Sequence, residues 1–155
     1  MTDIIGVDVG KFGCLVSLSD PNNYLLMPMM EDKRDGVDLD IITPWLISYD
    51  IKEGQQLIVC IEQQWTFGVE GRVSIAYLML QYGQLRGLCN MFNCHIVPVR
   101  AWKDHHNIKS RYGGKQQAID VVAKLYPDLN WPKLQTHRHG LADAILIALY
   151  GRDTE

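Results

Sequence analysis

The sequence feature that most constrains the fold is a wholly apolar run at residues 57–61, which ends at Glu62. A short run of this kind, with no polar side for water, is typical of a central strand in a parallel sheet. A second β-rich run covers residues 4–9 and stops at Gly10, and it predicts another buried strand. A parallel sheet needs helices on its faces, so the two runs favour an α/β domain.

The remaining elements follow from periodicity and turn residues. Further strands are predicted at residues 14–18, 24–29 and 95–99, and helices at residues 38–50, 73–92, 114–125 and 139–150. Short links between the first three strands favour an antiparallel meander, and Pro98 favours an edge position for the last strand. The helix at 139–150 is apolar almost all round and should be buried. We see no linker that divides residues 1–155, so we expect one domain with a mixed sheet and helices on its faces.

Charge is unevenly distributed along a mildly acidic chain of 155 residues with a net charge of −3. The overall acidity argues against binding nucleic acid through bulk charge alone. Residues 1–60 hold four Lys/Arg and ten Asp/Glu, a net of −6, whereas residues 100–138 hold eight Lys/Arg and three Asp, a net of +5. Two interpretations of the basic stretch stay open: an ordinary solvated surface, or a surface that faces phosphates.

The chain shows no sign of membrane insertion or export. It contains no run of about 18 apolar residues that would span a bilayer. Its N-terminus, Met1-Thr2-Asp3-Ile4, lacks the basic region and apolar core of a signal peptide. We therefore expect a cytoplasmic, intracellular protein with no membrane partner.

Three acids stand where hydrophobic residues dominate. Asp8 and Glu62 lie at the ends of the two apolar strands, and Asp143 lies within the apolar helix. Each acid alone has an ordinary explanation. Asp8 could cap the turn at Gly10, Glu62 could be a strand end in solvent, and Asp143 could lie on the solvated side of a mostly buried helix. Together they are explained most simply by convergence on a cation, because an isolated buried carboxylate is costly and Mg²⁺ prefers oxygen ligands.

His139 lies four residues before Asp143, so both side chains would share one face of the helix. An imidazole there could ligate a metal or move a proton near neutral pH. The alternative is that His139 only begins the helix.

Five sequence blocks span nearly the whole chain. They are Ile5-Gly6-Val7-Asp8-Val9-Gly10, Ile61-Glu62-Gln63-Gln64-Trp65, Gly83-Gln84-Leu85-Arg86-Gly87, Gly113-Gly114-Lys115-Gln116-Gln117-Ala118 and Ala142-Asp143-Ala144-Ile145-Leu146-Ile147-Ala148. In identity and order they resemble the RuvC-type Holliday junction resolvases of the RNase H-like superfamily. The most specific part is the Ile-Glu-Gln block followed by the helix with Gly-Gln-x-Arg-Gly.

This resemblance implies an RNase H-like α/β fold with a five-stranded mixed sheet, a homodimer, and two Mg²⁺ or Mn²⁺ ions per active site. It implies an endodeoxyribonuclease that resolves four-way (Holliday) DNA junctions in recombination and repair. By matching position, Asp8, Glu62 and Asp143 are the metal-binding acids. Many relatives carry an acid three residues before the last Asp, where this chain has Gly140, and others use histidine nearby. His139 is therefore the expected fourth ligand.

The resemblance also implies a DNA-binding surface. Lys115 matches a family lysine near the DNA backbone, and Trp65 occupies the place of an aromatic that contacts junction bases. We expect Lys103, Lys109 and Arg111 to neutralise further phosphates. Trp65 would stack on an unpaired base, unless it is only a partly buried loop aromatic. The expected reaction is hydrolysis with two metal ions about 3.5–4 Å apart that leaves 5′-phosphate nicks, one from each protomer of the dimer.

Other functions stay open. A nuclease of the same fold could act on other branched DNA or on RNA–DNA hybrids, and a junction-binding module could lack catalysis. Actin-like and sugar-kinase phosphotransferases also begin with a strand that carries Asp-x-Gly. They need two such domains, far more than 155 residues, and the sequence has no phosphate-binding P-loop.

Overall fold

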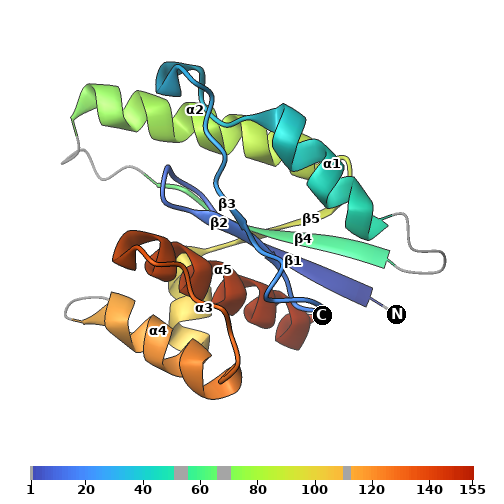
Figure 1. Cartoon of the computed structure of the whole chain (residues 1–155), viewed down its shortest axis with the longest axis vertical. Coiled ribbons are helices and arrows are strands. Elements are labelled where there is room, and N and C mark those ends of the chain that lie inside the picture. The colour runs from blue at the N-terminus through green and yellow to red at the C-terminus, as the bar shows by residue number, and fades with distance from the viewer. Residues whose placement is uncertain (1, 51–55, 66–70, 110–112) are drawn as a thin grey trace.

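The computed structural model describes residues 2–50, 56–65, 71–109 and 113–155. Within them lies a five-stranded mixed sheet with the strand order β3-β2-β1-β4-β5 (Figure 1). The strands are β1 (Thr2–Asp8), β2 (Cys14–Ser17), β3 (Leu25–Leu26), β4 (Gln56–Glu62) and β5 (Asn93–Val97). The first three strands are antiparallel neighbours, and β4 runs parallel to both β1 and β5. The predicted α/β class, antiparallel meander and five-stranded mixed sheet are confirmed.

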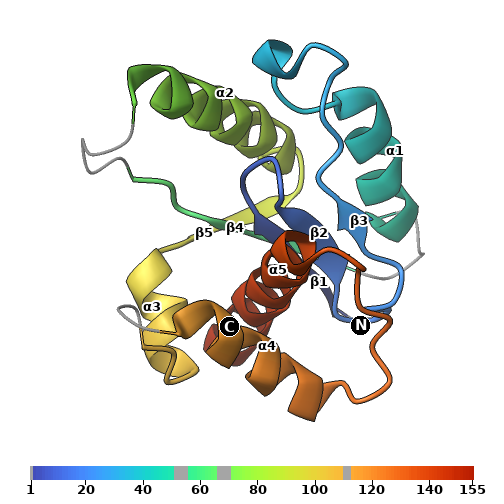
Figure 2. The ribbon, with the colours of Figure 1, turned by 60° about the vertical axis from the view of Figure 1, so that its left-hand side comes forward.

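Helices cover both faces of the sheet. One face carries α1 (Leu39–Asp50) and α2 (Arg72–Cys89), with the short 3₁₀ helix η1 (Lys33–Asp35) before them (Figure 1). The other face carries α3 (Val99–His105), α4 (Gly114–Leu125) and α5 (Gln135–Thr154), with α5 lying against the sheet (Figure 2). None of the helices in the described segments is long and apolar enough to cross a membrane.

The apolar run of β4 is buried because both of its faces are covered. Ile58 and Cys60 pack in the cluster that contains α5, whereas Val59 and Ile61 pack in the cluster that contains α1 and α2. Helix α5 is buried along most of its length, as its nearly continuous apolar sequence predicts.

Several predicted boundaries are wrong, for local reasons. Strand β3 has two residues instead of six, and Pro28, which has no N–H for a sheet ladder, follows shortly after it. Strand β5 is at the edge as predicted, but it ends at Val97, and Pro98 caps α3. Helix α5 begins at Gln135, four residues before the predicted start, which periodicity missed because the first turn is polar. Helix α3 was not predicted, since its seven residues are too few to show helical periodicity.

Candidate functional site

The parallel pairing of β1 and β4 brings two of the predicted acids together. Val7 lies beside Ile61 in the register, so Asp8 and Glu62, each one residue later, end adjacent strands at the same edge of the sheet. Side chains alternate along a strand, and Ile58 and Cys60 face α5. Glu62 therefore faces α5, the helix that carries Asp143.

The three carboxylates are close enough for their charges to act on one another. Burial raises the pKa of Asp8 well above its ordinary value, and the negative charges of Asp143 and Glu62 raise it further. Burial, followed by the charge of Glu62, raises the pKa of Asp143 to about 7. Burial also raises the pKa of Glu62. The structure thus places the three sequence-predicted acids in one cluster, where a bound cation would relieve their repulsion.

Two lysines face this acidic cluster. The positive charge of Lys103 lowers the pKa of all three carboxyls, and that of Lys115 lowers the pKa of Asp8 and Asp143. Lys103, Lys115 and Asp143 line one cavity of about 370 Å³, together with Lys109. The cluster is therefore open to solvent on a side where lysines surround it.

Glu62 is held by two donors that lie on different segments. Trp102 of α3 donates from Nε1 to Glu62 Oε2 at 2.8 Å, and Gln64 donates from Nε2 to Oε1 at 3.0 Å. Both hydrogen bonds lower the pKa of Glu62 against the larger effect of burial. Both favour the ionised form of Glu62, which is the form that binds cations.

His139 lies beside the acids, as its spacing from Asp143 predicts. It lines a second cavity, of about 280 Å³, with Asp8, Lys115 and Asp143. Its Nδ1 atom is buried, and no hydrogen-bond partner for it occurs in the described part of the chain. Burial and the charge of Lys115 lower the pKa of His139, which favours the neutral imidazole. A neutral imidazole with a free ring nitrogen has the chemistry of a metal ligand.

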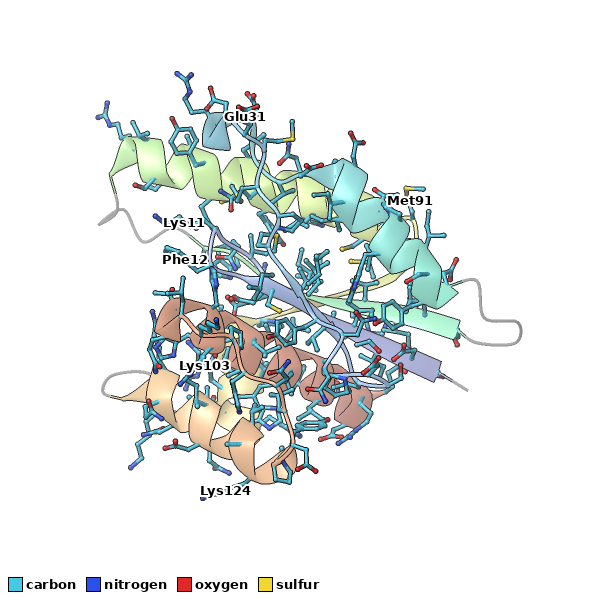
Figure 3. The ribbon with its side chains drawn as sticks, in the orientation of Figure 1. Lys11, Phe12, Glu31, Met91, Lys103 and Lys124 are labelled. Atoms are coloured by element: carbon cyan, nitrogen blue, oxygen red, sulfur yellow. The ribbon has the colours of Figure 1, made fainter. Side chains whose placement is uncertain are left out.

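The position of Gly140 explains why this chain has no acid there. Gly140 is buried against the turn between β1 and β2, and a Cβ at this position would overlap the backbone carbonyl of Phe12. Any side chain at this position, including an acid, would force this turn away. Figure 3 shows Lys11 and Phe12 of this turn, and Lys103 of α3, at the end of the molecule where β1 and β4 finish.

The predicted DNA-binding residues fall into three groups. Lys103, Lys109 and Lys115 border the cavity that contains Asp143. Trp65 is 61% exposed and lines a separate cavity of about 640 Å³, which Lys103 also borders. Arg111 lies outside the described residues.

Sequence reasoning missed Trp102 and Gln64, which touch Glu62 directly. Gln64 follows Glu62 by two residues and lay within a quoted sequence block, but we assigned it no role. Trp102 lies 40 residues from Glu62, and nothing local in the sequence connects the two. The only signal was the tryptophan directly before Lys103, a residue that we predicted to neutralise phosphates.

The donor set fits a hard divalent cation. It consists of three carboxylates and one neutral imidazole with a free nitrogen, and oxygen-rich sets of this kind suit Mg²⁺ and Mn²⁺. Across residues 2–50, 56–65, 71–109 and 113–155, no group of three His, Cys, Asp or Glu side chains already has an arrangement that could hold a metal ion.

No model of a known protein family matches the chain, and neither does any curated protein. The RNase H-like assignment therefore stays a prediction, which depends on the sequence blocks and on the geometry of this site.

Proposed function

We propose that this protein is an RNase H-like endonuclease of the RuvC type, which cuts four-way DNA junctions with divalent cations. The observation that carries the proposal is the convergence of Asp8, Glu62 and Asp143 at one end of the sheet. A protein that only bound DNA would gain nothing from three acids whose burial and repulsion cost stability. The five-stranded mixed sheet supports the same fold assignment.

The acids and His139 would hold the cations, Mg²⁺ or Mn²⁺. Bound divalent ions supply an activated water and stabilise the leaving oxygen in phosphodiester hydrolysis. Trp102 and Gln64 favour the ionised form of Glu62 and orient its carboxylate. Neutral His139 lies beside the acids without adding a positive charge that would repel a cation.

The lysines and Trp65 would bind the DNA. Lys103, Lys109 and Lys115 surround an opening beside Asp143, where they can neutralise phosphates on both sides of the scissile bond. Trp65 is exposed next to the same lysine-rich edge, so an unpaired base can stack on its indole. This arrangement favours a branched substrate over uninterrupted duplex, whose bases are already stacked.

We further propose a homodimer that places two such sites on one junction. Helix α2 supports it, because its outer side exposes Val73 and Leu80 and carries Gly83 and Gly87. A Cβ at either glycine would meet no other atom within 4 Å, so a second helix can approach closely.

The proposal is tested with a substrate panel in Mg²⁺ and in Mn²⁺: a four-way junction, a flap, a linear duplex and an RNA–DNA hybrid. We expect junction cleavage with 5′-phosphate ends. Asp8→Asn should abolish cleavage and keep junction binding, whereas Asp120→Asn, a control on the exposed surface of α4, should cut normally.

Three results would contradict the proposal in different ways. Normal cleavage by Asp8→Asn would refute the assignment of the site. Preferred cleavage of flaps or hybrids would refute the four-way junction as the substrate but would still support metal-dependent hydrolysis. Junction binding with no cleavage under either cation would identify a non-catalytic module.

A further inference from the structure

We propose that Trp102 is a positioning residue, which fixes the Glu62 carboxylate with its indole N–H and the Lys103 ammonium with its ring face. The inference rests on the proposed function, since it concerns the same acidic cluster. It assigns a role to a residue that neither touches the DNA nor binds a cation.

The first observation is the hydrogen bond from Trp102 Nε1 to Glu62 Oε2, at 2.8 Å. Trp102 has no exposed surface, and it packs in the cluster between the sheet and α5. A buried indole N–H needs an acceptor, and an ionised carboxylate forms a stronger bond with it than a neutral group does. Because the surrounding core fixes the indole, the bond transmits that rigidity to the carboxylate.

The bond leaves Glu62 able to bind a cation. Trp102 occupies one lone pair of Oε2, and Gln64 occupies one of Oε1 at 3.0 Å. Each carboxylate oxygen has a second lone pair, so both oxygens can still approach a cation. The orientation of the carboxylate is therefore set before a cation arrives, which is the usual role of groups behind a metal ligand.

The second observation concerns the ring face. The Nζ atom of Lys103 lies 5.2 Å from the centroid of the Trp102 ring, within the range of a cation–π contact. Lys103 borders the cavity that contains Asp143 and also the cavity that contains Trp65. The rigid Trp102 side chain thus orients the Glu62 carboxylate through its indole N–H and the Lys103 ammonium through its ring face.

Helix α3 is anchored in a way that keeps Trp102 in place. At its C-terminal end, His106 Nε2 is 2.9 Å from the carbonyl oxygen of Leu146 on α5, and His105 Nε2 is 3.1 Å from Asp153 Oδ2. These contacts connect α3 to the helix that carries Asp143, and the Trp102 bond connects α3 to Glu62.

The test measures Mn²⁺ binding to the full chain without DNA, by isothermal titration calorimetry. Trp102→Phe keeps an aromatic ring and removes the N–H, and we expect its Mn²⁺ affinity to fall by about 10- to 100-fold. Trp131→Phe is the matched control, because Trp131 packs partly buried against the same cluster, whereas the indole hydrogen bond to Glu62 comes from Trp102. Its Mn²⁺ affinity should equal that of the wild type.

A second readout works even where Trp102→Phe folds poorly. In wild-type ¹H–¹⁵N spectra, Mg²⁺ should shift the indole N–H signal of Trp102, and substoichiometric Mn²⁺ should broaden it before that of Trp131. Mn²⁺ broadening shows that the Trp102 N–H lies beside the bound cation, and the Mn²⁺ affinity of Trp102→Phe then distinguishes positioning from packing. A Trp102 signal that does not shift at saturating Mg²⁺, or wild-type Mn²⁺ affinity in folded Trp102→Phe, would overturn this inference. Either result would leave the proposed function intact. Wild-type protein that binds no divalent cation would overturn the proposed function and this inference with it.

Discussion

Removing the charge of Asp143 should stabilise the cation-free protein at pH 8. Burial and the charge of Glu62 raise the pKa of Asp143 to about 7 in the folded state, against an ordinary value of 3.8. The difference, 7 − 3.8, is about 3 units. At about 1.4 kcal/mol per unit, ionised Asp143 costs the folded state about 4 kcal/mol.

The sign of the pH dependence follows from proton binding. Between pH 3.8 and about 7, the unfolded chain has released the Asp143 proton while the folded protein still holds it. The contribution of Asp143 to the free energy of unfolding therefore falls as pH rises through this range, and it is constant above it. Asp143→Asn carries no titrating group, so this decline should be absent from the variant.

The assay is urea unfolding from pH 4 to pH 8 in EDTA, for the wild type and Asp143→Asn. The advantage of the variant should grow from near zero at pH 4 to about 4 kcal/mol at pH 8. Asp120→Asn, which changes an exposed acid, should show no such trend. Added Mg²⁺ should stabilise the wild type more than the variant, because a ligand stabilises the state that binds it. A variant advantage that stays constant or shrinks with pH would refute the reasoning.

Three further substitutions test the packing and the DNA surface. Gly140→Ala should lower the free energy of unfolding by about 1–3 kcal/mol because its Cβ overlaps the backbone of Phe12; an unchanged free energy in urea unfolding would contradict this packing. Lys115→Ala should weaken junction binding and reduce its salt slope by about one, and an unchanged slope in a filter-binding series would exclude a phosphate contact. Trp65→Ala should cost about 1–3 kcal/mol of junction affinity at unchanged stability, since the side chain is 61% exposed; a lower melting temperature would instead indicate a packing role.

The placement of the acids was accessible from the sequence because it depends on local periodicity. The apolar runs before Asp8 and Glu62 predict buried parallel strands, and paired parallel strands end at one edge of the sheet. The continuous apolar pattern around Asp143 predicts a buried helix, which has to pack on that sheet. Spacing alone placed His139 on the side of α5 that carries Asp143.

The residues that hold the acids in place could not be predicted from the sequence in the same way. Helix α3 is too short to show a period, so the bond from Trp102 to Glu62 follows only from the tertiary packing of α3 against the sheet and α5. The close contact of Phe12 with Gly140 depends on the conformation of the turn between β1 and β2, which no residue pattern in the sequence predicts.

Direct measurement of Mn²⁺ binding without DNA tests most sharply whether Asp8, Glu62 and Asp143 share bound cations. Calorimetric titration of the wild type and of Asp8→Asn, Glu62→Gln and Asp143→Asn compares their dissociation constants. We predict that the wild type binds Mn²⁺ and that each of the three substitutions weakens binding at the same site. Wild-type affinity in all three variants would contradict the account.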